Sequence, residues 1–306
     1  MSDELSSILD GQPERLASGF IFTEGPVWHP NGFLYFVDIR RSHLLQWAPG
    51  QQAHVVRENT GEGNGLTFDL QGRLVMCEGG NRRVARTESD GAITVLADRW
   101  RGKRLNRPND VVCHSNGNIY FTDPQGRLPR EERELGYSGV WRIDPNGRLH
   151  LATDECEYPN GLAFSPDESV LYVAITRLDE RCLGEKERGE VCAHQKIRAF
   201  DVAPDGSLRN NRIFADMSSA EPGVPDGMKV DTAGRVFCTG SGGIWIFDKD
   251  GRHLGTLRTP EVTANCAFGG SDYRTLFLTS STSIQTVRVK TPGVKVPWAR
   301  RTTVAR

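Results

Sequence analysis

The 306-residue sequence has no long hydrophobic run, since its longest apolar stretches are the length of single β-strands. A membrane-spanning helix needs about 20 consecutive apolar residues, so we expect no membrane span. The net charge is −1 and no basic tract with interleaved aromatics occurs. We therefore expect neither nucleic acid nor an anionic membrane as a partner. No stretch keeps a long 3.6-residue apolar period, which predicts very little helix.

The N-terminal end and the cysteines carry no sign of export. Residues 1–5 are acidic and lack an apolar segment, so we expect no signal peptide. The seven cysteines are an odd number and lie scattered along the chain. Cys77 and Cys238 fall inside apolar runs, where a reduced cysteine packs as a small hydrophobic residue. These features predict a reducing, cytoplasmic location.

Common catalytic motifs are also missing. No Gly-x-Ser-x-Gly elbow occurs, and the Ser-Gly-Gly run at 241–243 reads as a turn. No glycine-rich phosphate loop followed by Lys and Ser or Thr is present. A cysteine nucleophile stays open, although the sequence places none of the seven dispersed histidines beside one.

A hairpin pattern occurs six times. Each copy opens with a carboxylate or amide residue, enters an apolar strand, turns at Gly, Asn or Asp, and continues into a second apolar strand; the first copy spans 24–38. The opening residues are Glu24, Asn64, Asn109, Asn160, Asp226 and Asn265, at intervals of 40, 45, 51, 66 and 39 residues. Hairpin repeats of about 40–50 residues are typical of propeller blades. We therefore predict an all-β, six-bladed β-propeller that forms a single domain over residues 1–306.

Some segments fall outside the repeat. Residues 1–15 read as a polar N-terminal lead-in, and 16–22 as a strand that completes the last blade. We expect the charged segment 125–137 to lie over a channel face. The charged loop insertion at 178–194 contains Cys182, Cys192 and His194. A zinc site there is conceivable, but the spacing matches no common pattern, and a solvated lid or edge loop is favoured.

The opening residues predict a ring at one mouth of the propeller channel, because the innermost strand of every blade runs along that channel. Asn-Gly and Asp-Gly pairs can also be plain turn residues, but six in register favour a ring. Glu24, Asn109, Asn160 and Asp226 together offer two carboxylates and two amide oxygens. This set suits a hard divalent cation, with Ca²⁺ ahead of Mg²⁺ and Mn²⁺.

Such an ion polarises a carbonyl or phosphoryl oxygen and acidifies a bound water. An ester or lactone carbonyl is the natural substrate, because its developing oxyanion would lie on the metal. Two carboxylates around one channel also favour a bound cation, since like charges there cost stability without one.

Four motifs follow one another along the chain: EGPVW at 24–28, RPND at 107–110 with FTDP at 121–124, YPNGL at 158–162 and VPDGM at 224–228. Together they resemble the SMP-30/gluconolactonase/LRE-like family, and the match runs in consistent order from about residue 15 to 290. The resemblance implies a six-bladed propeller with one divalent metal held by Glu24, Asn160 and Asp226. Family members include sugar lactonases, and relatives hydrolyse organophosphates.

The resemblance also implies roles for single residues. Asp226 would help to activate water as a base, and Asn109 would be a fourth ligand or a substrate contact. Arg107 would contact the sugar acid, and we count Asn64 with the substrate-binding residues. Asp110 would orient Asn109 or the ligand sphere, or shape the turn.

The sequence departs from the family pattern in two places, the insertion at 178–194 and the run at 77–83, which lacks a histidine that bacterial members often have. The first hypothesis is a metal-dependent lactonase that opens a small lactone, in particular a sugar aldonolactone. The alternatives are the same metal site acting on an organophosphate, aryl ester or pathway-specific substrate, and a non-catalytic ligand-binding propeller. Zinc is a further possible metal. We expect wall residues from 125–137 and 178–194 to set specificity, and a monomer or weak homodimer as the default.

Overall fold

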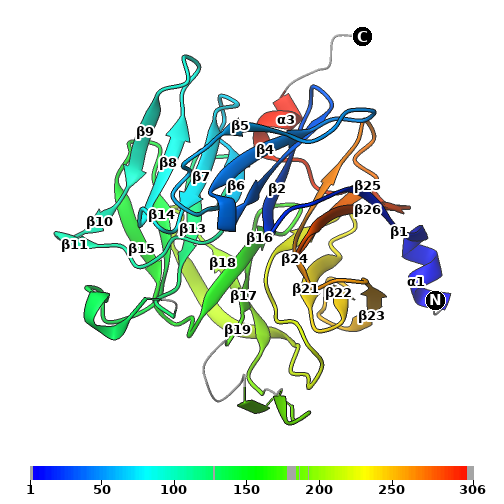
Figure 1. Ribbon diagram of the computed structural model, residues 1–306. Coiled ribbons are helices and arrows are strands. Elements are labelled where there is room, and N and C mark those ends of the chain that lie inside the picture. The colour runs from blue at the N-terminus through cyan, green and yellow to red at the C-terminus, as the bar shows by residue number, and fades with distance from the viewer. Residues whose placement is uncertain (1–2, 127, 178–183, 186, 192, 302–306) are drawn as a thin grey trace.

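The computed structural model describes residues 3–126, 128–177, 184, 185, 187–191 and 193–301. They form six four-stranded antiparallel sheets arranged around a central axis, and this confirms the predicted six-bladed β-propeller (Figure 1). The six innermost strands β2, β6, β12, β16, β20 and β24 each contact the next one around the axis, and β24 contacts β2. The blades therefore close into a ring.

In blades one to five, four strands pair in chain order from the axis outward. Blade one contains β2 (Thr23–His29), β3 (Phe33–Asp38), β4 (His43–Trp47) and β5 (His54–Arg57), and blade two contains β6 (Gly63–Phe68), β7 (Leu74–Glu78), β8 (Arg83–Thr87) and β9 (Ile93–Ala97). Blade three contains β12 (Val111–Cys113), β13 (Ile119–Asp123), β14 (Gly139–Ile143) and β15 (Leu149–Thr153). Blade four contains β16 (Pro159–Phe164), β17 (Val170–Ile175), β18 (Lys196–Val202) and β19 (Leu208–Asp216), and blade five contains β20 (Met228–Val230), β21 (Val236–Gly240), β22 (Gly243–Phe247) and β23 (His253–Arg258).

Blade six joins the two ends of the chain. It contains β24 (Thr263–Gly269), β25 (Thr275–Ser280), β26 (Ser283–Val289) and, outermost, β1 (Leu9–Ser18). An N-terminal strand therefore completes the last blade, but it covers Leu9–Ser18 and not the predicted 16–22. The predicted polar lead-in 1–15 was wrong in part, because it contains α1 (Asp3–Ile8) and the start of β1, with Ile8 and Leu9 buried. Two register shifts along β1 break the alternation that marks a strand in sequence.

The remaining elements are short. They are the hairpin β10 (Arg99–Trp100) and β11 (Lys103–Arg104), the 3₁₀ turns η1 (Ile39–Arg41) and η2 (Arg130–Glu132), and α3 (Pro297–Arg301). Among the described residues, no helix is long and apolar enough to cross a membrane. The insertion 178–194 falls between β17 and β18, and its Cys182 and Cys192 lie outside the described residues.

The hydrophobic core lies between neighbouring blades. One cluster joins Val75 and Cys77 of blade two to Phe121 and Trp141 of blade three, and similar clusters fill the other interfaces. Apolar side chains on both faces of a sheet are buried, which explains the strand-length apolar runs. Because the apolar side chains pack between the blades, the starts of the innermost strands surround the axis, where the polar ring was predicted.

Candidate functional site

A cavity of about 50 Å³ opens at one mouth of the channel, enough for a few waters. Blades one to five contribute its walls. The lining residues are Phe22, Glu24, Ile39, Glu62, Asn64, Gly79, Arg107, Pro108, Asn109, Pro124, Tyr158, Asn160, Thr176, Val224 and Asp226. Five of the six predicted ring residues are among them.

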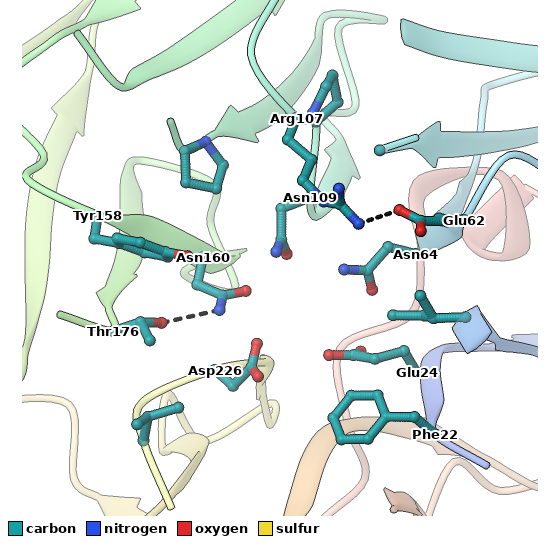
Figure 2. Close-up of a pocket in the computed structure, with 15 residues that line it drawn as sticks. Phe22, Glu24, Glu62, Asn64, Arg107, Asn109, Tyr158, Asn160, Thr176 and Asp226 are labelled. Carbon is teal, nitrogen blue, oxygen red and sulfur yellow. Dashed lines mark hydrogen bonds and ion pairs between the residues drawn. The ribbon is translucent and has the colours of Figure 1, made fainter. Parts of the chain in front are cut away.

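The polar ends of these five residues point toward one another. Figure 2 shows the carboxylates of Glu24 and Asp226 and the amides of Asn64, Asn109 and Asn160 directed into the same space. They come from five different blades, so their proximity depends on closure of the ring. The arrangement forms an oxygen-rich cup above the channel.

The prediction that Asn265 is the sixth ring residue was wrong. Cys266 pairs with Leu278 in the register in which Leu66 pairs with Met76, so Asn265 aligns with Gly65 and not with Asn64. The Gly227 N–H donates to the Ala264 carbonyl, as the Gly161 N–H donates to the carbonyl of Asp226. The sixth ring position is therefore Ala264. A shift of one residue in register moves a side chain to the other face of its strand. The alignment of the six opening residues in the sequence could not detect this shift.

The position after each ring residue forms a second layer. Glycine occupies four of its six places, at 25, 65, 161 and 227. A Cβ at Gly161 would lie 2.1 Å from the Asp226 carbonyl oxygen, and one at Gly227 would lie 2.0 Å from Cγ of Asn265. Only glycine lets the strand starts approach this closely. The two exceptions, Asp110 and Asn265, fill the centre that the glycines leave.

Asp110 and Asn265 are buried and contact each other beneath the ring. Asn265 Nδ2 donates to Asp110 Oδ2 at 3.5 Å, and each side chain also accepts the N–H of the residue that follows it, at 2.8 Å. The predicted role of Asp110 in orienting Asn109 or the ligand sphere stays a prediction. The Asp110 carboxylate is part of the floor of the cup and does not line the cavity.

Thr176 fixes the orientation of Asn160. Its Oγ1 donates to the Pro225 carbonyl at 2.6 Å, so it accepts from Asn160 Nδ2 at 2.9 Å. A hydroxyl has a single proton to donate, so the amide nitrogen must face Thr176. Asn160 Oδ1 is then left on the other side, buried and without a hydrogen-bond partner among the described residues, and Asn64 Oδ1 is in the same condition.

Burial raises the pKa of Glu24 to about 7, and the nearby Asp110 carboxylate adds to this effect. Hydrogen bonds from the Gly25 N–H and Asn265, and the charge of Lys229, act in the opposite direction. Burial also raises the pKa of Asp110. The cup thus concentrates negative charge in a poorly solvated place, where a bound cation would favour the ionised carboxylates.

The residues present fit a hard divalent cation. Glu24 and Asp226 supply two carboxylates, and Asn160 supplies a buried amide oxygen that has no hydrogen-bond partner among the described residues. No described histidine or cysteine lines the cavity. Within the described part of the chain, no three His, Cys, Asp or Glu side chains gather elsewhere as an alternative site. Buried acceptors without donors are costly unless something positive approaches them.

The cysteines do not offer a nucleophile among the residues described. Cys77, Cys113, Cys156, Cys238 and Cys266 are buried and free. Burial raises the pKa of the Cys113, Cys156 and Cys266 thiols to about 12, which opposes formation of the reactive thiolate.

Arg107 lines the cavity, and its guanidinium forms an ion pair with Glu62 across the mouth (Figure 2). Sequence analysis did not select Glu62, because the pair joins residues 45 apart and no motif marks it. Phe22, Ile39, Tyr158 and Val224 were also missed. No described residue of 125–137 or 178–194 lines this cavity. Residues 127, 178–183, 186 and 192 lie outside the described residues, so the role of these segments in specificity stays a prediction.

Asp123 anchors the backbone that carries Arg107. Its carboxylate accepts the N–H of Asn106 at 2.8 Å and that of Arg107 at 2.6 Å. Burial raises the pKa of Asp123 to about 7 in spite of these hydrogen bonds. The RPND and FTDP motifs thus meet, the second holding the first at the cavity.

Comparisons with known proteins show the family and the fold of the chain. The family model described as "SMP-30/Gluconolactonase/LRE-like region" matches residues 22–282. A gluconolactonase of Zymomonas mobilis is 33% identical over 322 residues, covering 95% of this chain and 86% of the relative. A pentonolactonase of Haloferax volcanii is 30% identical over 270 residues, covering 84% and 81%.

A solved structure also resembles this chain over almost its whole length. The gluconolactonase of Xanthomonas campestris superposes with a TM-score of 0.81 at 33% identity, covering 94% of this chain and 93% of that one. The similarity extends over the blades that build the cup.

The glycine layer leads to a stability prediction. Gly161→Ala should lower the free energy of unfolding by about 1–3 kcal/mol, because its Cβ would overlap the backbone of Asp226. Gly136→Ala is the matched control, since a Cβ there meets no atom within 4 Å, and it should change stability by less than about 0.5 kcal/mol. Urea unfolding followed by circular dichroism measures both. Equal stability of the two variants would contradict the close approach of the strand starts.

The buried Asp123 leads to a pH prediction. The folded protein holds its proton up to about pH 7, whereas an unfolded chain releases it near pH 4. Between these values the folded state binds more protons, so stability falls as the pH rises. Asp123→Asn removes this titration, and its free energy of unfolding should decline less between pH 4.5 and 7.5 than that of the unaltered protein. Parallel pH dependence of the two proteins in urea unfolding would refute the assignment.

Proposed function

The chain belongs to the SMP-30/gluconolactonase/LRE-like family, and from this premise we propose that it is a divalent-metal-dependent hydrolase that opens a small lactone. A sugar aldonolactone is the proposed substrate class, in line with relatives named gluconolactonase and pentonolactonase. The observation that carries the proposal is the cup. In it Asn160 Oδ1 and Asn64 Oδ1 are buried beside the carboxylates of Glu24 and Asp226, and no described residue donates a hydrogen bond to either amide oxygen.

The proposed cofactor is one divalent ion held by Glu24, Asn160 and Asp226, with Asn109 as a fourth ligand or a substrate contact. Ca²⁺ is favoured by the all-oxygen set, and Mg²⁺, Mn²⁺ or Zn²⁺ are alternatives. When bound, such an ion supplies positive charge for a developing oxyanion and lowers the pKa of water.

The chain's own residues perform the rest of the reaction. The Asp226 carboxylate faces the cavity and is the proposed general base, which accepts a proton from the attacking water. Asn64 and Asn109 present amide groups that hydrogen-bond ring hydroxyls, and Arg107 orients the sugar from the mouth. The water oxygen bonds to the acyl carbon, the ring C–O bond then breaks, and the alkoxide leaving group takes up the proton that Asp226 had accepted.

The remaining walls limit the access of bulk water. Phe22, Ile39, Tyr158 and Val224 place apolar surface around the polar cup. A drier site strengthens each electrostatic contact with the substrate. Beneath it, Asp110 and Asn265 act as positioning residues that keep Glu24 and Asn109 in place.

Metal removal tests the proposal. Protein stripped with EDTA should hydrolyse glucono-1,5-lactone at least 100-fold more slowly, an order-of-magnitude expectation for loss of the main electrostatic catalyst. Adding back Ca²⁺, Mg²⁺, Mn²⁺ and Zn²⁺ separately should restore turnover, which pH-stat titration of the released acid measures over a panel of lactones.

Two variants sharpen this experiment. Asp226→Asn preserves the shape of the side chain but removes its basicity, so it should lose activity to a similar extent. Asp250→Asn removes a carboxylate from an exposed turn of blade five and should leave turnover unchanged. Undiminished hydrolysis by the stripped protein or by Asp226→Asn would rule out the proposed site.

A further inference from the structure

The ion pair at the mouth of the cavity gives a further inference, which rests on the proposed function. Of the described residues that line the cavity, Arg107 is the only one with a positive charge, and Glu24, Glu62 and Asp226 are acidic. The side chains of Arg107 and Glu62 are 26% and 40% exposed, so the pair lies at the edge of the cavity within reach of a substrate.

The backbone holds Glu62 in an uncommon conformation. Its φ is +53°, in the left-handed region that residues other than glycine and asparagine rarely adopt. Its N–H donates to Ser42 Oγ at 3.1 Å, and its carbonyl accepts the N–H of Gly79 at 3.2 Å. These two hydrogen bonds fix the backbone from which the Glu62 side chain reaches Arg107.

Two consecutive glycines make room for the pair. A Cβ at Gly79 would lie 3.1 Å from Cγ of Arg107, and one at Gly80 would lie 3.2 Å from Oε2 of Glu62. The two arms of the ion pair thus pass over the Gly-Gly turn that follows β7. The ion pair occupies this side of the cavity.

The pair changes the charge that a substrate meets. A guanidinium forms two parallel hydrogen bonds with a carboxylate or phosphate, so an unpaired arginine at the mouth would capture anionic groups. Glu62 already engages the Arg107 guanidinium and cancels its charge. A divalent ion would likewise balance Glu24 and Asp226, which leaves the whole cavity close to neutral.

We propose that Glu62 is a specificity-determining residue that makes the cavity select neutral, hydroxyl-rich lactones over lactones that carry a carboxylate or phosphate. It does so by pairing with Arg107, while its second oxygen accepts a hydrogen bond from a substrate hydroxyl. The acid that the reaction releases is itself an anion. The same pairing therefore weakens its retention and favours product release.

Charge-neutral variants of Glu62 test this assignment. Glu62→Gln retains the size of the side chain, and Glu62→Asn tolerates the left-handed backbone better while being too short to reach Arg107. Glu58→Gln is the matched control, because it removes the same charge from an exposed position of the same loop. Circular dichroism and thermal unfolding verify that each variant folds.

The first measurement compares kcat/KM for glucono-1,5-lactone and for glucaro-1,4-lactone, which carries a carboxylate, in metal-loaded protein at constant ionic strength. Both Glu62 variants should raise the ratio in favour of the anionic lactone by about tenfold, the size expected for one unit charge at short range in a partly solvated site. Glu58→Gln should leave the ratio within twofold of the unaltered protein. An unchanged ratio in both folded Glu62 variants would overturn the proposal.

A second measurement does not depend on turnover. Calorimetric titration of EDTA-stripped protein with sulfate reports the Arg107 guanidinium directly, and sulfate should bind the Glu62 variants about tenfold more tightly than the unaltered chain. Adding Arg107→Gln to Glu62→Gln should abolish the gain. If the unaltered chain opened no lactone, the proposed function would fail while tighter sulfate binding still supported the role of Glu62. If sulfate affinity did not change, the role of Glu62 would be refuted whatever the catalytic result.

Discussion

The close approach of six strand starts around one axis is the constraint on which the rest of the structure depends. Glycines at 25, 65, 161 and 227 are required because a side chain there would meet the neighbouring strand. Because these glycines carry no side chain, the ring residues that precede them come within reach of a common point. The ring of Glu24, Asn64, Asn109, Asn160 and Asp226 follows from this approach, since five blades each deliver one oxygen-bearing side chain to one cavity. Asp110 and Asn265 fill the remaining centre and form its floor.

The same closeness has an electrostatic cost. Glu24 lies in a poorly solvated place near the Asp110 carboxylate, and its pKa rises to about 7. Two amide oxygens of the cup also lack donors among the described residues. Folding has therefore assembled a site that is unfavourable on its own and that a divalent cation would stabilise. At the mouth, the opposite charges of Glu62 and Arg107 balance each other in an ion pair. This division into a charged floor and a neutral mouth suits a polar but uncharged substrate.

The sequence predicted the architecture well because the hairpin pattern is local. Turn residues and apolar strands recur within each blade, and the four motifs around the axis lie in that same pattern, so the six-bladed propeller and the five cavity residues could be read directly. Failures arose where the determinant was not local. Asn265 was assigned to the ring because a one-residue slip is visible only in the register of β24 against β25. Glu62 was missed because its partner Arg107 is distant in sequence. The strand β1 was misplaced because its bulges interrupt the alternation.

The most direct test of the account is a crystal structure of the protein soaked with Mn²⁺, with anomalous diffraction used to locate the ion. The account predicts one strong anomalous peak in the channel mouth, about 2.1–2.6 Å from carboxylate oxygens of Glu24 and Asp226 and from Asn160 Oδ1. Asn160 should keep its hydrogen bond to Thr176, since that contact directs the amide oxygen to the ion. No peak in the cup at saturating Mn²⁺, or a peak elsewhere on the molecule only, would contradict the claim that the closed ring of blades builds a metal site.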